Sequence, residues 1–181
     1  MRRILPIAIL CLLAVATTGC KKAQLRRQLK ELMGSTIVLP EKISCVYNGE
    51  VYPMPDSLRD KPKLIIYIDS TECSLCSISR FVNYEPVFEF AYKSGLFETI
   101  ILLSPKSQES HIIQDYLLSY NFSHPVYMDS EHMYKNSNPN ISTEMFHCLL
   151  INSLGYPVFV GDPSDSAIKD LMFNSINTFE L

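Results

Sequence analysis

The chain has 181 residues, of which 47% are hydrophobic, and a formal net charge of −3. This length and apolar content predict one globular domain with a substantial core. Because the charge is close to neutral, we exclude nucleic-acid binding.

The first twenty residues have the pattern of an export signal. Arg2 and Arg3 precede an apolar run over residues 4–16, which is too short for a comfortable membrane span. A Thr-Thr-Gly-Cys sequence ending at Cys20 then follows, and it resembles the lipobox of bacterial lipoproteins. That resemblance implies a signal peptide over residues 1–19, a lipid on the Cys20 thiol, and attachment to the bacterial cell envelope facing the periplasm. The alternative is an ordinary secretory signal with a chance cysteine.

Residues 20–36 are basic and carry apolar side chains at helical spacing. The apolar positions are Leu25, Leu29, Leu32 and Met33. We interpret this segment as a lipid-anchored helical linker that docks on the domain while its basic side chains stay in water. The alternative is a helix that lies on anionic lipid beside the anchor.

Residues 37–181 alternate between strand and helix patterns. Asn48-Gly49 lies between two short apolar runs and predicts a hairpin. Continuous apolar runs over 64–68 and 99–103 predict strands covered on both faces. The other expected elements are a helix over 74–93 kinked at Pro86, a helix over 107–120, a strand over 125–128, a polar loop over 129–144 with one helical turn, a hairpin over 146–160 and a helix over 167–176. This order predicts an α/β sheet with an antiparallel edge.

The segment from Asp69 to Cys76 is the most informative part of the chain. It follows a buried strand and begins a helical pattern with a Cys-x-x-Cys pair, Cys73 and Cys76. Two cysteines at this spacing close a disulfide within one helical turn, and the first lies where helix N–H groups stabilise a thiolate. Export would place the pair in a compartment where disulfides persist. The pattern therefore predicts a dithiol redox centre.

With these pieces in place, residues 37–176 resemble the thioredoxin-fold superfamily. The resemblance is greatest to the TlpA-like and redoxin-like thiol–disulfide oxidoreductase lipoproteins of the bacterial envelope. It implies an α/β thioredoxin-like fold in which helices flank a central mixed sheet, with an N-terminal β-hairpin extension, so that residues 37–181 form one thioredoxin-like domain.

The resemblance also implies roles for individual residues. Cys73 would be the attacking thiol and Cys76 the resolving thiol of a redox-active disulfide, and Met145 and Phe146 would lie at the substrate edge. The partners would be protein thiols or disulfides in the envelope, with the membrane reached through the lipid on Cys20. We expect no cofactor, no bound metal, and a monomer.

The chain departs from the family pattern at several positions, and one of them is the dipeptide between the cysteines, where Ser74-Leu75 replaces the family's Gly-Pro or other proline-containing pair. Glu72 stands before the first cysteine, where active members usually carry Trp, and a carboxylate at that point opposes thiolate formation. No proline occupies the place of the family's cis-proline near Phe146, and the nearest preceding one is Pro139. Asp69 is the candidate for the family's buried carboxylate, at a different offset from the cysteines.

Two other functions fit the same residues. Cys73 and Cys76 could bind copper or zinc together with His147 or Cys148, as a metal-handling protein. A non-catalytic interaction lipoprotein could use the pair only as a structural disulfide. For the remaining cysteines, Cys45 and Cys148 either pair with each other or are two buried free thiols.

Overall fold

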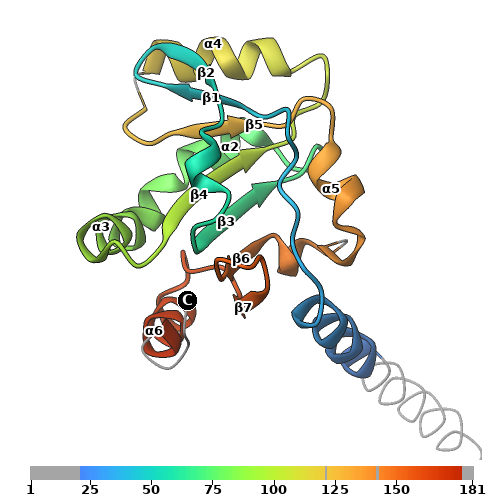
Figure 1. Cartoon of the computed structure of the whole chain (residues 1–181). Helices are drawn as coiled ribbons and strands as arrows, with labels where there is room; N and C mark the ends of the chain where they lie inside the picture. Colours follow the sequence, from blue (N-terminus) through green and yellow to red (C-terminus); the bar gives the residue numbers. More distant parts are fainter. Residues whose placement is uncertain (1–20, 121, 142, 177–181) are drawn as a thin grey trace, which may run out of the picture.

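The computed structural model describes residues 21–120, 122–141 and 143–176. A seven-stranded sheet in the order β2-β1-β5-β4-β3-β6-β7 runs through the molecule, with helices on its faces (Figure 1). The strands are β1 Ser44–Tyr47, β2 Glu50–Pro53, β3 Lys63–Ile68, β4 Glu98–Leu103, β5 Val126–Met128, β6 Cys148–Ile151 and β7 Pro157–Val160. The α-helices are α2 Ser74–Ser79, α3 Glu85–Ser94, α4 Ser110–Tyr120, α5 Met133–Ser137 and α6 Ser166–Ile176. The short 3-10 helices are η1 Asp56–Leu58, η2 Phe81–Tyr84, η3 Pro139–Ile141 and η4 Glu144–Phe146. The predicted α/β class is confirmed.

The centre of the sheet is parallel and its edges are antiparallel. β3 pairs in parallel with β4, and β4 with β5, through helical crossovers. All six residues of β3 are buried, as their continuous apolar run predicts. β6 joins the other side of β3 in the antiparallel sense, so the central strand lies between an antiparallel and a parallel neighbour.

The predicted N-terminal hairpin forms at Asn48 and Gly49. Both residues have positive φ, 51° and 76°, which is the conformation that a two-residue primed turn requires. β1 then pairs antiparallel with β5, so the hairpin extends the sheet at the edge opposite β6 and β7.

Alternation along the strands divides the core into two layers. On one face, side chains such as Ile66, Ile101 and Leu150 pack against α2, α3, α4 and α6. On the other face, Ile65, Leu102 and Leu149 pack beneath the N-terminal segment and the region of α5, η3 and η4. The second face is therefore covered by short elements and extended chain.

The structure corrects the predicted helix over 74–93. The helical segment breaks into α2, η2 and α3, and Pro86 lies in the first turn of α3. A helix tolerates proline in its first turn, because an N–H group at that position has no intrahelical partner. Pro86 therefore begins a helix where we expected it to kink one. The region over 129–144, expected to be mostly loop, holds α5 and the two short helices η3 and η4.

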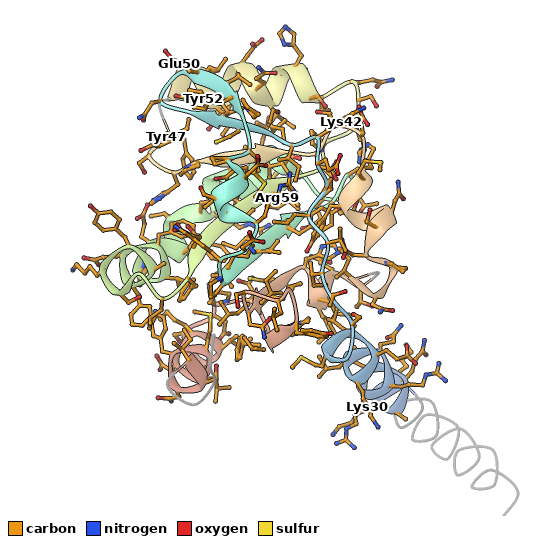
Figure 2. The ribbon with its side chains drawn as sticks, viewed as in Figure 1. Lys30, Lys42, Tyr47, Glu50, Tyr52 and Arg59 are labelled. Carbon is orange, nitrogen blue, oxygen red and sulfur yellow. A yellow bond between two sulfur atoms is a disulfide. The ribbon has the colours of Figure 1, made fainter. Side chains whose placement is uncertain are left out.

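The segment before β1 is fixed to the domain. Residues 21–33 are helical, and Leu32 near their end is fully buried in the second core layer. The Asn138 side chain then accepts a hydrogen bond from the Val38 N–H and donates one to the Val38 carbonyl, both at 2.8 Å. Arg59 lies beside the extended chain (Figure 2) and donates to the carbonyl oxygens of residues 39, 40 and 41.

The predicted signal peptide over residues 1–19 and the predicted lipid site at Cys20 lie outside the described residues. Among the helices of the described ranges, none combines the length and apolar character needed to cross a bilayer.

Candidate active site

The cysteine pair lies at the surface, at the carboxyl end of the central strand. β3 ends at Ile68, residues 69–72 turn, and α2 begins after Cys73. Cys73 and Cys76 form a disulfide with their Cα atoms 5.2 Å apart, and both residues are exposed. A dissolved thiol can therefore reach the sulfur atoms without unfolding of the chain.

Local backbone geometry favours a thiolate on Cys73. This residue is the N-cap of α2, and its Sγ accepts a hydrogen bond from the Cys76 N–H at 3.3 Å. A hydrogen bond to the charged form of a group favours that form. Because α2 has only six residues, we assign the effect to this nearby N–H group.

Asp69 holds the loop that carries the cysteines. Its Oδ1 accepts from the Ser70 N–H at 2.7 Å, and its carboxylate pairs with the Lys135 ammonium on α5. Burial alone would raise the pKa of Asp69, but the hydrogen bonds from Lys135 and Ser70 lower it below its ordinary value. Asp69 is thus an ionised anchor of the loop, paired with the Lys135 cation.

Glu72, next to Cys73, pairs with His147. The Glu72 Oε1 accepts from the Asp69 N–H at 3.1 Å and lies 2.9 Å from the His147 Nδ1. Since an ionised carboxylate only accepts, Nδ1 carries a proton in this pair. His147 is 7% exposed, and its Nε2 has no hydrogen-bond partner among the described residues.

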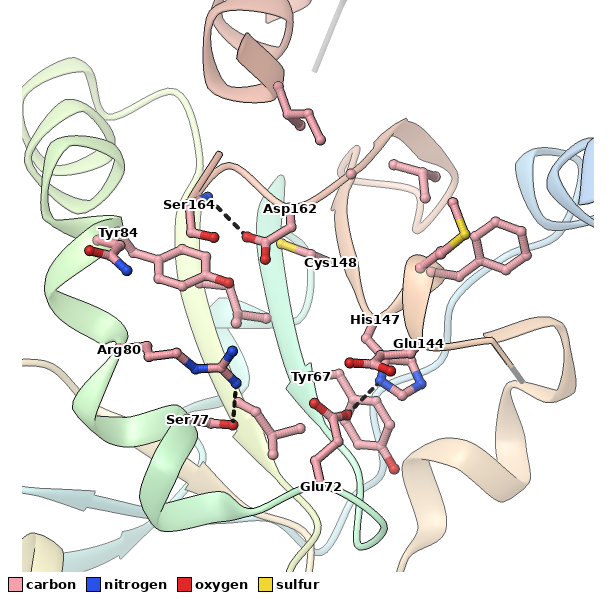
Figure 3. Close-up of a pocket in the computed structure, with 18 of the residues that line it drawn as sticks. Tyr67, Glu72, Ser77, Arg80, Tyr84, Glu144, His147, Cys148, Asp162 and Ser164 are labelled. Carbon is pink, nitrogen blue, oxygen red and sulfur yellow. Dashed lines mark hydrogen bonds and ion pairs between the residues drawn. The ribbon is translucent and has the colours of Figure 1, made fainter. Parts of the chain in front are cut away.

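A cavity of about 510 Å³ opens beside this pair. Figure 3 shows Glu72 and His147 directed toward each other on one side, with Ser77 and Arg80 across from them and Asp162 farther along. Both residues of the predicted substrate edge line it: Met145 is 63% exposed, whereas Phe146 is buried in the core. Of the two, Met145 therefore offers the accessible surface.

Comparison with known proteins identifies the architecture. No protein-family model and no curated protein sequence matches the chain. Among solved structures, an uncharacterised thioredoxin-like protein of Porphyromonas gingivalis is 15% identical, with a TM-score of 0.50, over 79% of this chain and 93% of its own. A candidate thiol:disulfide interchange protein DsbE of Chlorobium tepidum is 13% identical, with a TM-score of 0.52, over 78% of this chain and 96% of its own. The chain has a thioredoxin-like fold.

The thioredoxin-like sheet separates the two remaining cysteines. Cys45 on β1 and Cys148 on β6 are buried free thiols in opposite core layers, with β5, β4 and β3 between their strands. Four strand spacings of about 4.8 Å place them far beyond disulfide reach. Burial raises the pKa of both thiols, so both are protonated and unreactive at neutral pH.

The donors proposed for a metal site do not gather around the cysteine pair. Within the described ranges, no group of three or more His, Cys, Asp and Glu side chains has the arrangement to hold a metal ion. His147 directs Nδ1 to Glu72, and Cys148 lies in the core layer beneath α2 and α3.

Several site residues escape sequence reasoning. Lys135 and His147 lie 66 and 75 positions from their carboxylate partners, and neither pairing has a local signal. Arg80, at the end of α2, likewise looks like an ordinary surface cation in sequence. The placement of Cys73 and Cys76 between a buried strand and a helix was readable along the chain, whereas the partners of Asp69, Glu72 and His147 were not.

Proposed function

We propose that this protein is a thiol–disulfide oxidoreductase of the bacterial cell envelope that exchanges disulfides with protein substrates through Cys73 and Cys76. The observation that carries the proposal is the exposed disulfide at the end of the central strand of a thioredoxin-like sheet. A lipid on Cys20 would hold the domain at the membrane, on the periplasmic side.

The reaction follows from the geometry of the pair. A substrate thiolate attacks the Cys73 sulfur, the Cys73–Cys76 bond breaks, and Cys76 leaves as a thiolate that takes a proton from water. The second substrate thiol loses its proton and attacks the substrate sulfur of the mixed disulfide, and Cys73 leaves as a thiolate. The substrate dithiol is oxidised and the pair reduced, and a second protein disulfide re-oxidises the pair. The reverse sequence reduces a substrate disulfide.

The hydrogen bond from the Cys76 N–H supports the assignment of Cys73 as the sulfur that bonds to substrate. It stabilises Cys73 as the leaving thiolate in the last step and as the attacking thiolate in the reverse direction.

A purely structural role for the disulfide has less support. The bond closes a loop with a sequence separation of only three. A crosslink over so short a loop restricts the unfolded chain least and therefore stabilises the fold least. Its exposure also leaves it open to exchange.

An insulin reduction assay coupled to dithiothreitol tests the activity. We expect turnover by the purified full-length protein, loss of turnover in Cys73→Ser, and accumulation of a mixed disulfide in Cys76→Ser. Cys45→Ala, which removes a buried thiol on the far edge of the sheet, is the matched control and should retain activity. Equal rates for the wild type and Cys73→Ser would refute the proposal.

Lipid attachment has a separate test. Cells fed labelled palmitate should incorporate label into the wild-type protein and not into Cys20→Ala. Label retained by the variant would rule out the proposed anchor without affecting the proposed chemistry.

A further inference from the structure

We propose that the helix over residues 21–33 docks on a membrane surface rich in anionic lipid headgroups, through one face that is basic and partly apolar. The inference goes beyond the exchange reaction proposed above and does not depend on it. To the lipid proposed on Cys20 it adds a contact that the folded chain makes by itself.

The helix is basic, whereas the rest of the domain is acidic. Residues 21–33 carry five Lys and Arg side chains and one Glu, and residues 34–181 carry nine Lys and Arg against eighteen Asp and Glu. An anionic surface therefore attracts the helix and repels the bulk of the domain. This separation of charge favours one orientation of the molecule, with the helix toward the lipid.

The cations of the helix are available to a ligand. All five are exposed: Lys21, Lys22, Arg26, Arg27 and Lys30. Within the part of the chain that the structure describes, their one ion pair joins Arg27 to Glu31 at 3.8 Å, between two exposed side chains, and such pairs are weak. Figure 2 shows Lys30 where the helix extends away from the sheet. Phosphate groups of lipids can therefore approach these side chains.

Three of the cations share one face of the helix with two exposed apolar side chains. Successive members of this face follow one another at intervals of three or four residues, which makes them neighbours on the helix surface. The face consists of Lys22, Arg26, Leu29, Lys30 and Met33. Leu29 and Met33 are 37% and 38% exposed. A helix in a membrane interface has this composition, because its basic side chains meet the headgroups while its apolar side chains reach the acyl boundary.

A different face fixes the helix to the domain. Leu32 is fully buried in the second core layer, and Leu25, seven positions earlier on the same side, is half-buried. Just beyond the helix, the Ile37 N–H donates to the Gly155 carbonyl at 2.9 Å. The helix can therefore stay attached to the domain while its basic face contacts lipid.

Vesicle partitioning tests the charge of this face. The full-length protein is mixed at low ionic strength with vesicles of phosphatidylcholine, alone or with phosphatidylglycerol, and bound protein is measured by sedimentation. Residues 1–20 are common to all variants, so a difference between variants reports on the helix. We expect Lys22→Gln/Arg26→Gln/Lys30→Gln to lose about a hundredfold in affinity for the anionic vesicles, at roughly fivefold for each cation.

A second triple variant is matched in charge. Lys42→Gln/Lys61→Gln/Lys93→Gln removes three exposed cations that lie outside the helix. We expect it to bind the anionic vesicles nearly as tightly as the wild type. Equal losses of affinity in the two triple variants would show that total net charge decides the binding, and would overturn the inference.

Lysine acylation tests the contact directly, even if residues 1–20 hold every variant on both kinds of vesicle. With a water-soluble acetylating reagent and peptide mapping, Lys30 should react about fivefold more slowly on anionic vesicles than on neutral ones. Lys93 on α3 should react at the same rate on both. High salt should remove the difference, because it screens charges at a surface.

Equal acylation of Lys30 on both kinds of vesicle would overturn the inference. Slow acylation of Lys30 without vesicles, at a rate that falls as the protein concentration rises, would overturn it too, because a second copy of the chain would then cover this face. Neither result changes what is expected for insulin reduction by Cys73 and Cys76, so failure of the inference is distinct from failure of the proposed function.

Discussion

At the scale of single residues, the site is shaped by two carboxylates with different partners. Asp69 is buried and paired with Lys135, so its charge stabilises the loop between β3 and α2. Glu72 is held by the Asp69 N–H and by His147 next to the reacting sulfur. Its negative charge beside Cys73 works against the hydrogen bond that the Cys76 N–H donates to the same sulfur.

Removal of the Glu72 charge should raise the reactivity of Cys73. In the reduced protein, Glu72→Gln should increase the alkylation rate of Cys73 by iodoacetamide at neutral pH roughly threefold, because a nearby negative charge disfavours the thiolate. Peptide mapping by mass spectrometry measures the rate. Glu144→Gln, on η4 at the same cavity, is the control, and an equal increase there would contradict a local effect of Glu72.

Asp69 should give the protein a stability term that depends on pH. Because the pKa of Asp69 is lowered in the folded state, its ionised carboxylate stabilises the fold fully above the ordinary pKa of 3.8. This stabilisation is lost as the pH falls through the folded-state pKa. We expect Asp69→Asn to reduce the free energy of unfolding by roughly 2 kcal/mol at pH 7. Urea titrations of both proteins over a series of pH values should show this difference shrinking below pH 3.8. A constant difference at every pH would refute it.

At the scale of elements, the turn between β6 and β7 links the sheet to the N-terminal segment. Gly155 in this turn has a φ of 85°, and an added Cβ would lie 3.1 Å from the Ile37 carbonyl oxygen. The Gly155 carbonyl accepts the Ile37 N–H in the same place. The close contact and the left-handed backbone both require glycine.

Gly155→Ala should therefore destabilise the fold more than the same change in the other hairpin. Gly49 also has a positive φ, of 76°, but an added Cβ there meets no atom within 4 Å. We expect losses of about 1 kcal/mol for Gly49→Ala and about 2 kcal/mol for Gly155→Ala. Thermal or urea unfolding would measure both, and equal losses would show that the contact with Ile37 carries no cost.

At the scale of the whole molecule, burial in the core separates the two free thiols from the exposed sulfur atoms of the redox pair. Cys73 and Cys76 lie at the surface, whereas Cys45 and Cys148 are buried in opposite core layers. The sheet brings the N-terminal helix, η4 and α2 around one cavity. The exposure of the redox pair and the shape of the cavity are thus properties of the assembled layers.

The four cysteine thiols within the described residues should differ sharply in accessibility. After reduction, iodoacetamide should label Cys73 and Cys76 in the native protein, and Cys45 and Cys148 only after denaturation, because burial raises the pKa of the latter two. Peptide mapping at intervals distinguishes them. Labelling of Cys148 at the rate of Cys73 under native conditions would contradict the burial described here.

Elements whose conformation depends on neighbouring residues could be predicted from the amino-acid order. The Asn48-Gly49 turn, the buried run of β3 and the cysteine pair at the start of a helix are local features, because turn geometry and hydrophobic periodicity act over a few positions. The α/β class and the position of the redox pair followed from them.

Tertiary structure alone decided which distant residues meet. The pairing of Glu72 with His147, the pairing of Asp69 with Lys135 and the place of Leu29 in the cavity wall all join residues far apart in the chain. Such contacts depend on strand order and register, which periodicity does not encode. The division of the expected long helix at residues 80–84 was also a matter of packing, since η2 buries Phe81 and Tyr84 in the core.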